Sequence, residues 1–247
     1  MKKTKIVLMS DSHSKHNGIY ILKQGEKFDD EYVKEYIISG VYLPAEADVI
    51  ICSGDISMSG SENEIDNFLA WYSKLPYTHK ILVPGNHDRL FEQKRSIAQE
   101  LLKKYPNIIY LESQGVTIDG IKFYGEPVQP TFGYNWAFNV DRGEKIKRYW
   151  DAIPDDVEFL ILHGPPYSIL DSTIRGEQVG CKDLLKRIYE LKNLKLVSFG
   201  HIHEHAGYKF IDGVHFVNAS VLNLRYEIQN KPMIFEIDEN KNITRIE

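Results

Sequence analysis

Five groups of polar residues in this chain carry side chains that can bind a metal ion, and each follows a short apolar run. The groups are Asp11-Ser12-His13, Gly54-Asp55, Gly85-Asn86-His87-Asp88, His163 and Gly200-His201-Ile202-His203. Carboxylate, imidazole and amide oxygen ligands suit divalent Mn, Fe, Zn or Ni, whereas the lack of thiolates argues against a structural zinc finger. Two such cations, held about 3.5–4 Å apart, can stabilise the attacking and leaving oxygens of an in-line displacement at phosphorus. The pattern therefore predicts a two-metal phosphoester hydrolase.

The elements that must position these groups are the apolar runs that precede them. Runs rich in Val and Ile are typical of buried strands, and here they cover residues 6–9, 49–52, 81–83, 159–162 and 196–199. In layered α/β proteins, sites form beyond the carboxyl ends of the strands, so we expect the five groups to converge at one edge of the core. Asp11 and His13 alternate by two, as do His201 and His203, so an extended strand end would turn each pair to one side. Asp55 stands alone at its strand end and is the natural carboxylate to bridge two cations.

Each group also has an ordinary structural explanation. Gly-Asp and Gly-Asn-His-Asp resemble common turns, Asp-x-His occurs by chance, and His163 stands beside a proline turn. Chance does not readily supply the five groups in this order, each after an apolar run. Because His87 directly follows Asn86, the two are not expected to face one ion. His87 is then available for catalysis, with Asp88 to fix its tautomer.

Together the five groups resemble the motif series of the calcineurin-like metallophosphoesterase superfamily. A narrower similarity, over residues 47–237, is to the metallophosphoesterase-domain-containing (MPPED, brain 239 protein) phosphodiesterases. The stretch from His16 to Glu46 is longer than that pattern and unmatched, so substrate preference is not carried over. The segments that carry the similarity are Trp136-Ala137-Phe138-Asn139 with Arg142-Gly143, His163-Gly164-Pro165-Pro166, Val179-Gly180-Cys181, Phe199-Gly200-His201-Ile202-His203-Glu204 and Asn218-Ala219-Ser220.

The resemblance implies a single domain over residues 1–247, folded as an α/β, layered αββα sandwich with two stacked mixed sheets flanked by helices. It also implies that His87 is a catalytic imidazole that binds no metal, and that Asp88 orients it. Some close relatives carry glycine where this chain has His201, which weakens their second metal site. Because His201 is present here, the resemblance implies a complete site for two divalent cations, with manganese favoured over Fe, Zn or Ni. The implied ligands are Asp11, His13, Asp55 and His203 for one cation, and Asp55, Asn86, His163 and His201 for the other.

The rest of the chain predicts helices and a second sheet. Ser61-Glu62-Asn63-Glu64 has the form of a capping box, and it opens an amphipathic pattern that continues to Leu75. Further helices are expected over residues 30–39, over residues 93–104 and after Cys181. Strand-like runs at residues 208–211, 214–217, 220–224 and 233–237, with Asp212-Gly213 as a hairpin turn, predict a second sheet stacked on the first.

The composition is that of an ordinary globular enzyme. With 247 residues and a net charge of −5 but no long basic stripe, extended nucleic-acid binding is not expected. The apolar run after the basic N-terminus is too short for a signal peptide or a membrane span, so we expect a cytoplasmic protein without membrane contact. Cys52 and Cys181 are expected to be buried thiols. No glycine-rich phosphate cradle is present, so metals are expected to hold the phosphate.

Three residues outside the ligand groups are candidates for substrate binding. Trp136 and Arg142 lie in a loop-rich stretch, which is either a packed surface loop or a wall that stacks a base or binds a phosphate. His205 extends the alternation of His201 and His203, and is either a solvated residue or part of the substrate pocket.

Three functions are compatible with these residues. The first, implied by the resemblance, is a phosphodiesterase on cyclic or small nucleotides, in which a metal-bound hydroxide attacks phosphorus. The second is a phosphomonoesterase or protein phosphatase with the same metal centre. The third is a non-enzymatic scaffold, against which the complete ligand set argues. We expect a small phosphoester, such as a nucleotide, as the partner, and the sequence leaves open whether the chain forms a homodimer.

Overall fold

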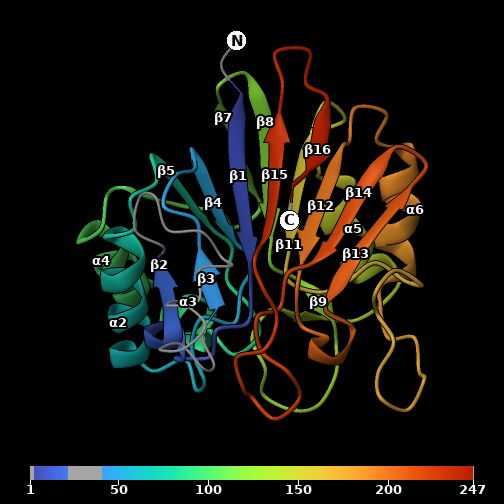
Figure 1. The fold of residues 1–247 in the computed structure, drawn as a ribbon. Coiled ribbons are helices and arrows are strands. Elements are labelled where there is room, and N and C mark those ends of the chain that lie inside the picture. The colour runs from blue at the N-terminus through green and yellow to red at the C-terminus, as the bar shows by residue number, and fades with distance from the viewer. Residues whose placement is uncertain (1–2, 22–40, 247) are drawn as a thin grey trace.

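Two six-stranded sheets, stacked face to face, form the centre of the molecule (Figure 1). The computed structural model describes residues 3–21 and 41–246. The first sheet has the order β16-β15-β1-β4-β5-β6. Strands β1, β4, β5 and β6 are parallel to one another, and β15 is antiparallel to both of its neighbours, β1 and β16. Its strands are β1 (Thr4–Met9), β4 (Val49–Cys52), β5 (His79–Leu82), β6 (Ile108–Tyr110), β15 (Met233–Ile237) and β16 (Ile243–Arg245).

The second sheet has the order β13-β14-β12-β11-β8-β7. Its four central strands are parallel, and the edge strands β13 and β7 are antiparallel to their neighbours. Its strands are β7 (Gln114–Ile118), β8 (Ile121–Glu126), β11 (Phe159–Leu162), β12 (Leu196–Phe199), β13 (Gly207–Ile211) and β14 (Val214–Asn218). Two short parallel pairs lie outside these sheets: β2 (Ile19–Ile21) with β3 (Val41–Leu43), and β9 (Gln129–Pro130) with β10 (Asn139–Val140).

Both faces of the central strands are buried. In β1, Ile6 and Leu8 pack between the two sheets, whereas Val7 and Met9 pack against the helices on the outer face. Strands β4, β5, β11 and β12 alternate in the same way. A strand covered on both sides requires apolar residues at successive positions, which is why these runs are continuous and do not alternate with polar residues.

Helices cover the outer face of each sheet (Figure 1). Helices α2 (Glu62–Ser73) and α4 (Arg95–Lys103) pack on the first sheet, and α5 (Glu144–Asp151) and α6 (Lys182–Glu190) on the second. The shorter α3 (Arg89–Gln93) and the 3-10 helices η1 (His16–Gly18) and η2 (His203–His205) lie in the connections. Within residues 3–21 and 41–246, every helix is too short or too polar to cross a bilayer.

The predicted layered α/β fold with two mixed sheets is confirmed, and so are two local motifs. Ser61 caps α2 with its side chain, and the Glu64 carboxylate accepts the backbone N–H of Ser61 in return. Asp212 and Gly213 both have positive φ, at 49° and 83°, and join β13 to β14 as an antiparallel hairpin. Two consecutive left-handed residues are what a type I′ hairpin turn needs.

The C-terminal strands were only partly predicted. The prediction that β15 belongs to the second sheet is wrong, because β15 pairs with β1 in the first. Strand β1 is buried, so its free edge needs a partner for its backbone groups. The predicted strand at residues 220–224 is also wrong: Ser220 and Leu222 form single bridges, to Ser10 and Ile228. The predicted helix over residues 30–39 lies outside the described residues.

The capping box at α2 gives a test of this local structure. Ser61→Ala removes the hydroxyl that bonds to the backbone and carboxylate of Glu64. Loss of such a cap costs about 1 kcal/mol, so we expect the free energy of unfolding in urea to fall by that amount. Ser96→Ala, at an exposed position in α4, is the matched control and should change stability little. Equal stability of both variants would contradict a stabilising cap.

Candidate metal centre

The predicted ligands come together in the loops that follow the carboxyl ends of β1, β4, β5, β11 and β12. These loops turn sharply: Asp11, His13, Asp55 and His201 have positive φ values of 55°, 38°, 50° and 70°. The prediction that Asp11 and His13 share a side because the strand continues through them is therefore wrong. The same holds for the last group, since His201 is left-handed and His203 begins η2. Left-handed turns, and not strand alternation, direct these side chains inward.

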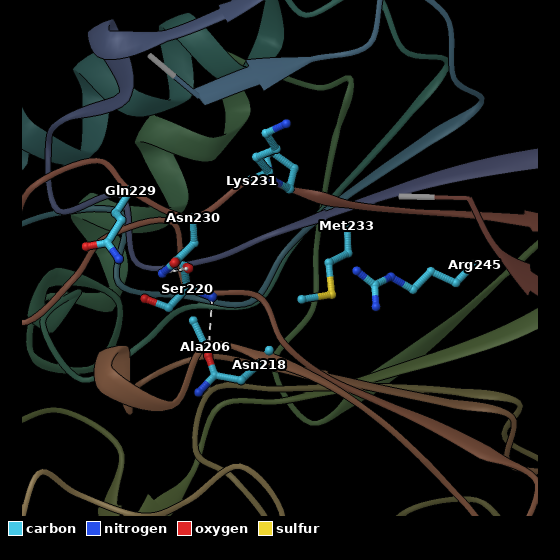
Figure 2. Close-up of a pocket in the computed structure, with 10 residues that line it drawn as sticks. Ala206, Asn218, Ser220, Gln229, Asn230, Lys231, Met233 and Arg245 are labelled. Atoms are coloured by element: carbon cyan, nitrogen blue, oxygen red, sulfur yellow. Dashed lines mark hydrogen bonds between the residues drawn. The ribbon is translucent and has the colours of Figure 1, made fainter. Parts of the chain in front are cut away.

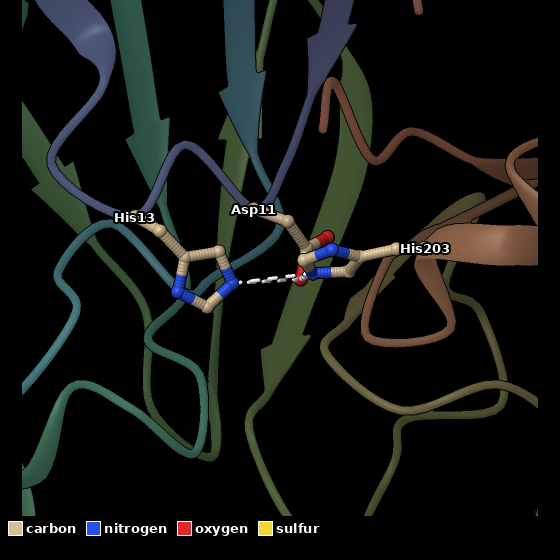
Figure 3. A group of neighbouring side chains, drawn as sticks. All are labelled: Asp11, His13 and His203. Atoms are coloured by element: carbon tan, nitrogen blue, oxygen red, sulfur yellow. Dashed lines mark hydrogen bonds and ion pairs between the residues drawn. The ribbon is translucent and has the colours of Figure 1, made fainter. Parts of the chain in front are cut away.

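Asp11, His13 and His203 form the first group, shown in Figure 3. All three are buried. The Nε2 atom of His203 lies 3.3 Å from Oδ1 of Asp11 and 3.2 Å from Nε2 of His13. Nε2 of His13 is 3.9 Å from the same Asp11 oxygen. The group thus brings together residues that are 192 positions apart in the chain.

Asp55, His163 and His201 form the second group, whose ligand atoms lie within 4.8 Å of one another. Nε2 of His163 is 3.4 Å from Oδ2 of Asp55 and 2.8 Å from Oδ1 of Asn86. Asn86 therefore adds an amide oxygen to this group. The backbone N–H of His201 donates to both carboxylate oxygens of Asp11, at 3.1 Å each, which ties the second group to the first.

The carboxylate of Asp55 lies between the two groups. Its Oδ2 atom is 3.5 Å from Nε2 of His13 and 3.4 Å from Nε2 of His163. Its Oδ1 atom accepts the backbone N–H of His87 at 2.8 Å, which fixes the plane of the carboxylate. One oxygen facing imidazoles of both groups is the arrangement that a bridging ligand requires.

Backbone carbonyls fix the orientation of the imidazoles. The Nδ1 atoms of His13, His163 and His203 lie 3.2, 3.0 and 3.1 Å from the carbonyl oxygens of Ser57, Ser53 and Asn223. A carbonyl oxygen can only accept, so each Nδ1 carries the hydrogen, and whenever a ring is neutral its lone pair is on Nε2, which is directed toward the cluster. Metal-binding histidines are commonly oriented by such a contact on the far nitrogen.

The charge balance of the cluster fits divalent cations. Burial lowers the pKa of His13 to about 4, and burial together with His163 lowers that of His201 to about 3, so both are neutral ligands at pH 7. Burial opposes a charge on His163 too, but the Asp55 carboxylate outweighs it and raises the pKa of His163 to about 9. The Nε2 lone pairs of His13 and His203, 3.2 Å apart, repel unless a proton or a metal cation lies between them. The buried carboxylates of Asp11 and Asp55 face these nitrogens, and together they form a set of ligands that suits a divalent cation.

Glycines in the ligand groups allow the close approach of the loops. A Cβ atom on Gly200 would overlap the carboxylate of Asp11, and a Cβ atom on Gly85 would overlap that of Asp55 and come within 2.8 Å of the His163 ring. The glycines of the sequence pattern are thus required by packing around the ligands, and any side chain there would displace a carboxylate.

His87 and Asp88 have different neighbours from those predicted. Nδ1 of His87 faces the carbonyl oxygen of Met58 at 2.6 Å, and the ring shares a group of candidate ligands with His13 and Asp55. The carboxylate of Asp88 instead accepts the backbone N–H groups of Ile56, Ser57 and Gly85 and the Ser57 hydroxyl. The prediction that Asp88 orients His87 is therefore wrong. Asp88 holds together the loops after β4 and β5, and the Met58 carbonyl orients the imidazole.

Trp136 lies directly against His87. Their ring centroids are 4.2 Å apart, and the guanidinium of Arg89 lies 5.6 Å from the tryptophan ring on an exposed side. Phe132 stacks beyond Trp136 at 6.4 Å and also contacts the His201 ring at 4.8 Å. Phe132 and Trp136 thus form an aromatic wall beside the cluster.

Arg142 and His205 are engaged in loop contacts. The guanidinium of Arg142 donates to the carbonyl oxygens of Val179 and Gly180, at 2.6 and 2.9 Å. Nδ1 of His205 accepts the backbone N–H of Ser172 at 2.9 Å. Both side chains therefore hold the loop between β11 and α6 in place, and these contacts lend no support to a direct role in substrate binding.

Several residues at the cluster were missed by the sequence analysis. Tyr226 packs against His13 and His203, Phe132 against His201, and the carbonyl groups of Met58 and Asn223 orient histidines. A backbone carbonyl carries no sequence signal. Tyr226 lies in a loop without periodicity, so only its position shortly after the Asn-Ala-Ser segment could have drawn attention to it.

A separate cavity of about 480 Å³ lies where the two sheets diverge (Figure 2). Its walls include Asn218, Ser220, Asn230 and Arg245, and none of its ten lining residues belongs to the ligand groups. One lining residue also contacts the last ligand group, because the Asn218 amide donates to the carbonyl of Ile202, which lies between His201 and His203 in sequence.

Comparisons with known proteins agree with this geometry. A family model described as calcineurin-like phosphoesterase matches residues 4–205. Metallophosphoesterase domain-containing protein 1 of Homo sapiens is 35% identical over 216 residues, which cover 79% of this chain and 66% of the human protein. The match therefore spans slightly less than two thirds of that relative.

Solved structures share the fold at low sequence identity. The Thermus thermophilus protein TT1561 aligns with a TM-score of 0.59 at 14% identity, over 99% of this chain and 98% of its own. A dimetal phosphatase from Danio rerio aligns with a TM-score of 0.52 at 12% identity, over 96% of this chain and 93% of its own. Because the family model covers most of the chain, the chain belongs to the calcineurin-like phosphoesterase family.

Proposed function

We propose that this protein is a phosphodiesterase that acts on cyclic or small nucleotides with the help of two divalent cations. The observation that carries the proposal is the position of Asp55, whose Oδ2 atom is within 3.5 Å of imidazole nitrogens from both ligand groups. A single carboxylate shared between two sets of candidate ligands is suited to a pair of ions and not to one.

The ligands divide between the cations as follows. Asp11, His13 and His203 would hold one, Asn86, His163 and His201 the other, with Asp55 shared. Manganese is the first candidate, and Fe, Zn and Ni suit the same donors. When bound, such a pair neutralises the phosphoester, polarises it and lowers the pKa of a water molecule that attacks phosphorus.

His87 is placed to handle the proton of the leaving oxygen. Its Nδ1–H donates to the Met58 carbonyl, so a second proton on the ring must be held at Nε2. The His13 and Asp55 ligand atoms that this ring faces lie within 4.8 Å of its own. An imidazole that carries its proton at Nε2 can pass it to the departing ester oxygen, while the Met58 carbonyl stabilises the charged ring.

One observation supports a diester with a planar organic arm over a monoester. The curated relative is named a metallophosphoesterase-domain protein and the structural neighbour a phosphatase, so neither name decides between the two. The aromatic wall of Phe132 and Trp136, however, lies beside His87, where the leaving arm of the ester would emerge. A flat ring beside the leaving position favours substrates in which that arm carries a nucleobase, and stacking on such a wall contributes about 1–3 kcal/mol per base.

Paired substrates test this proposal most directly. We expect the manganese-loaded protein to hydrolyse bis-p-nitrophenyl phosphate with a kcat/KM at least tenfold above that for p-nitrophenyl phosphate, which corresponds to about 1.4 kcal/mol. A panel of cyclic and linear nucleotides then identifies the substrate. Preference for the monoester would make the protein a phosphomonoesterase, and lack of hydrolysis of either compound would overturn the proposed function.

Elemental analysis tests the shared role of Asp55. We expect Asp55→Asn to lose both metal ions, because the neutral amide cannot replace a carboxylate that faces two groups. His203→Ala should lose mainly one ion, because its ring belongs to the first group alone. His79→Ala, at the opposite end of β5, serves as the control and should retain both. Two full equivalents in Asp55→Asn would exclude a bridging carboxylate.

The role of His87 predicts a dependence on the leaving group. His87→Ala should retain both metals and lose roughly 10²–10⁴-fold in turnover, the usual range for a positioned general acid. The loss should shrink for esters with acidic leaving groups, which need little protonation to depart. Loss of metal would make His87 a ligand, and an equal loss on all leaving groups would make it a stabiliser of the phosphate oxygens.

A further inference from the structure

Tyr226 is held against two candidate ligands of the first group. Its ring centroid lies 4.9 Å from that of His13 and 5.4 Å from that of His203, with interplanar angles of 83° and 74°. The ring is thus edge-on to both imidazoles. Tyr226 is not one of the candidate metal ligands.

Hydrogen bonds connect the loop that carries Tyr226 to His203. The carbonyl oxygen of Asn223 accepts both the Nδ1–H of His203 and the backbone N–H of Tyr226, at 3.1 and 2.9 Å. The side-chain oxygen of Asn223 accepts the N–H groups of Arg225 and Glu227. Tyr226 itself has a φ of 57°, which is unfavourable for a bulky side chain. Such strained residues persist where their surroundings enforce them, and they concentrate at functional sites.

Packing explains the ring of Tyr226 but not its hydroxyl. A phenylalanine would make the same edge-on contacts with the two imidazoles. In residues 3–21 and 41–246, no group forms a hydrogen bond with the Tyr226 hydroxyl. Phenol groups that are partly buried normally find a partner. Among the described residues the hydroxyl is therefore a donor without a partner, and it is carried by a ring that packs against His13 and His203.

A hydrogen-bond donor at the first group would add to what metal ions can offer a phosphoester. Asp11 and the imidazole Nε2 atoms present oxygen and nitrogen lone pairs, which can hold a cation but cannot donate to a phosphoryl oxygen. Tyr226 also stands at the far end of a row of rings from the aromatic wall. The successive centroids of Trp136, His87, His13 and Tyr226 are 4.2, 4.5 and 4.9 Å apart. A substrate along this row would meet Trp136 with its organic arm and Tyr226 with its phosphate.

We infer that Tyr226 is a substrate-contacting residue whose hydroxyl donates a hydrogen bond to a phosphoryl oxygen bound beside the first group. The inference rests on the proposed phosphoesterase function. It assigns part of the recognition of the phosphate to the Tyr226 side chain, in addition to the metal ions. A hydrogen bond to a charged oxygen changes affinity by about ten- to hundredfold.

The test compares Tyr226→Phe with wild type, each as the full chain loaded with manganese. We expect unchanged metal content and Tm, a KM for bis-p-nitrophenyl phosphate raised by about tenfold or more with a smaller change in kcat, and a matching loss of affinity for inorganic phosphate in calorimetry. Tyr189→Phe, at an exposed position in α6, is the control for removal of a hydroxyl and should match wild type. Trp136→Leu should raise the KM for the diester but leave phosphate affinity unchanged.

The outcomes separate this inference from the proposed function. An active Tyr226→Phe enzyme with wild-type KM and phosphate affinity would overturn the inference and leave the function intact. Loss of metal from Tyr226→Phe would assign the residue to support of the ligand histidines and would also overturn it. If wild type hydrolyses no phosphoester, the proposed function fails, and phosphate affinity still decides the inference: weaker binding by Tyr226→Phe supports it, and equal binding overturns it.

Discussion

The buried carboxylate of Asp55, placed between imidazoles of two groups, is the constraint on which the rest of the structure depends. A charge removed from water at the edge of the sheets is costly unless it is paired or coordinated. The neighbours of Asp55 meet that requirement: the backbone N–H of His87 donates to Oδ1, and the imidazoles of His13 and His163 lie beside Oδ2. The left-handed loops and the glycines beside the carboxylates bring these groups together at one point.

The scaffold orients its histidines with neutral partners. Three of the candidate ligands and His87 donate from Nδ1 to main-chain carbonyl oxygens, although a carboxylate, Asp88, lies in the next position of the chain. A carbonyl fixes the tautomer without adding negative charge to a cluster that already contains Asp11 and Asp55. Asp88 serves a different need, since four donors around its oxygens fasten the loops after β4 and β5 to each other.

The fold and the convergence of the ligand groups could be predicted from the sequence because both follow from local patterns. The continuous apolar runs reflect strands buried on two faces, and the Ser61–Glu64 and Asp212-Gly213 motifs depend only on neighbouring residues. Pairing of β15 with β1 depends on which edge is left open in space, and no local pattern records it. The partner of Asp88 was wrongly predicted for a similar reason, because adjacency in sequence does not decide which donors a turn presents.

The ligands of the first group are synthesised at very different times, because they lie far apart in the sequence. Asp11 comes from the loop after β1 and His203 from the loop after β12, so the two halves of the cluster belong to different sheets. During synthesis on the ribosome, the N-terminal half emerges with two acidic side chains and their imidazole neighbours long before residue 203 has been made. Before His163, His201 and His203 are in place, Asp11, His13 and Asp55 form an incomplete set of candidate ligands. The ligand set is therefore complete only in the folded protein, and a metal bound there would join loops that belong to different sheets.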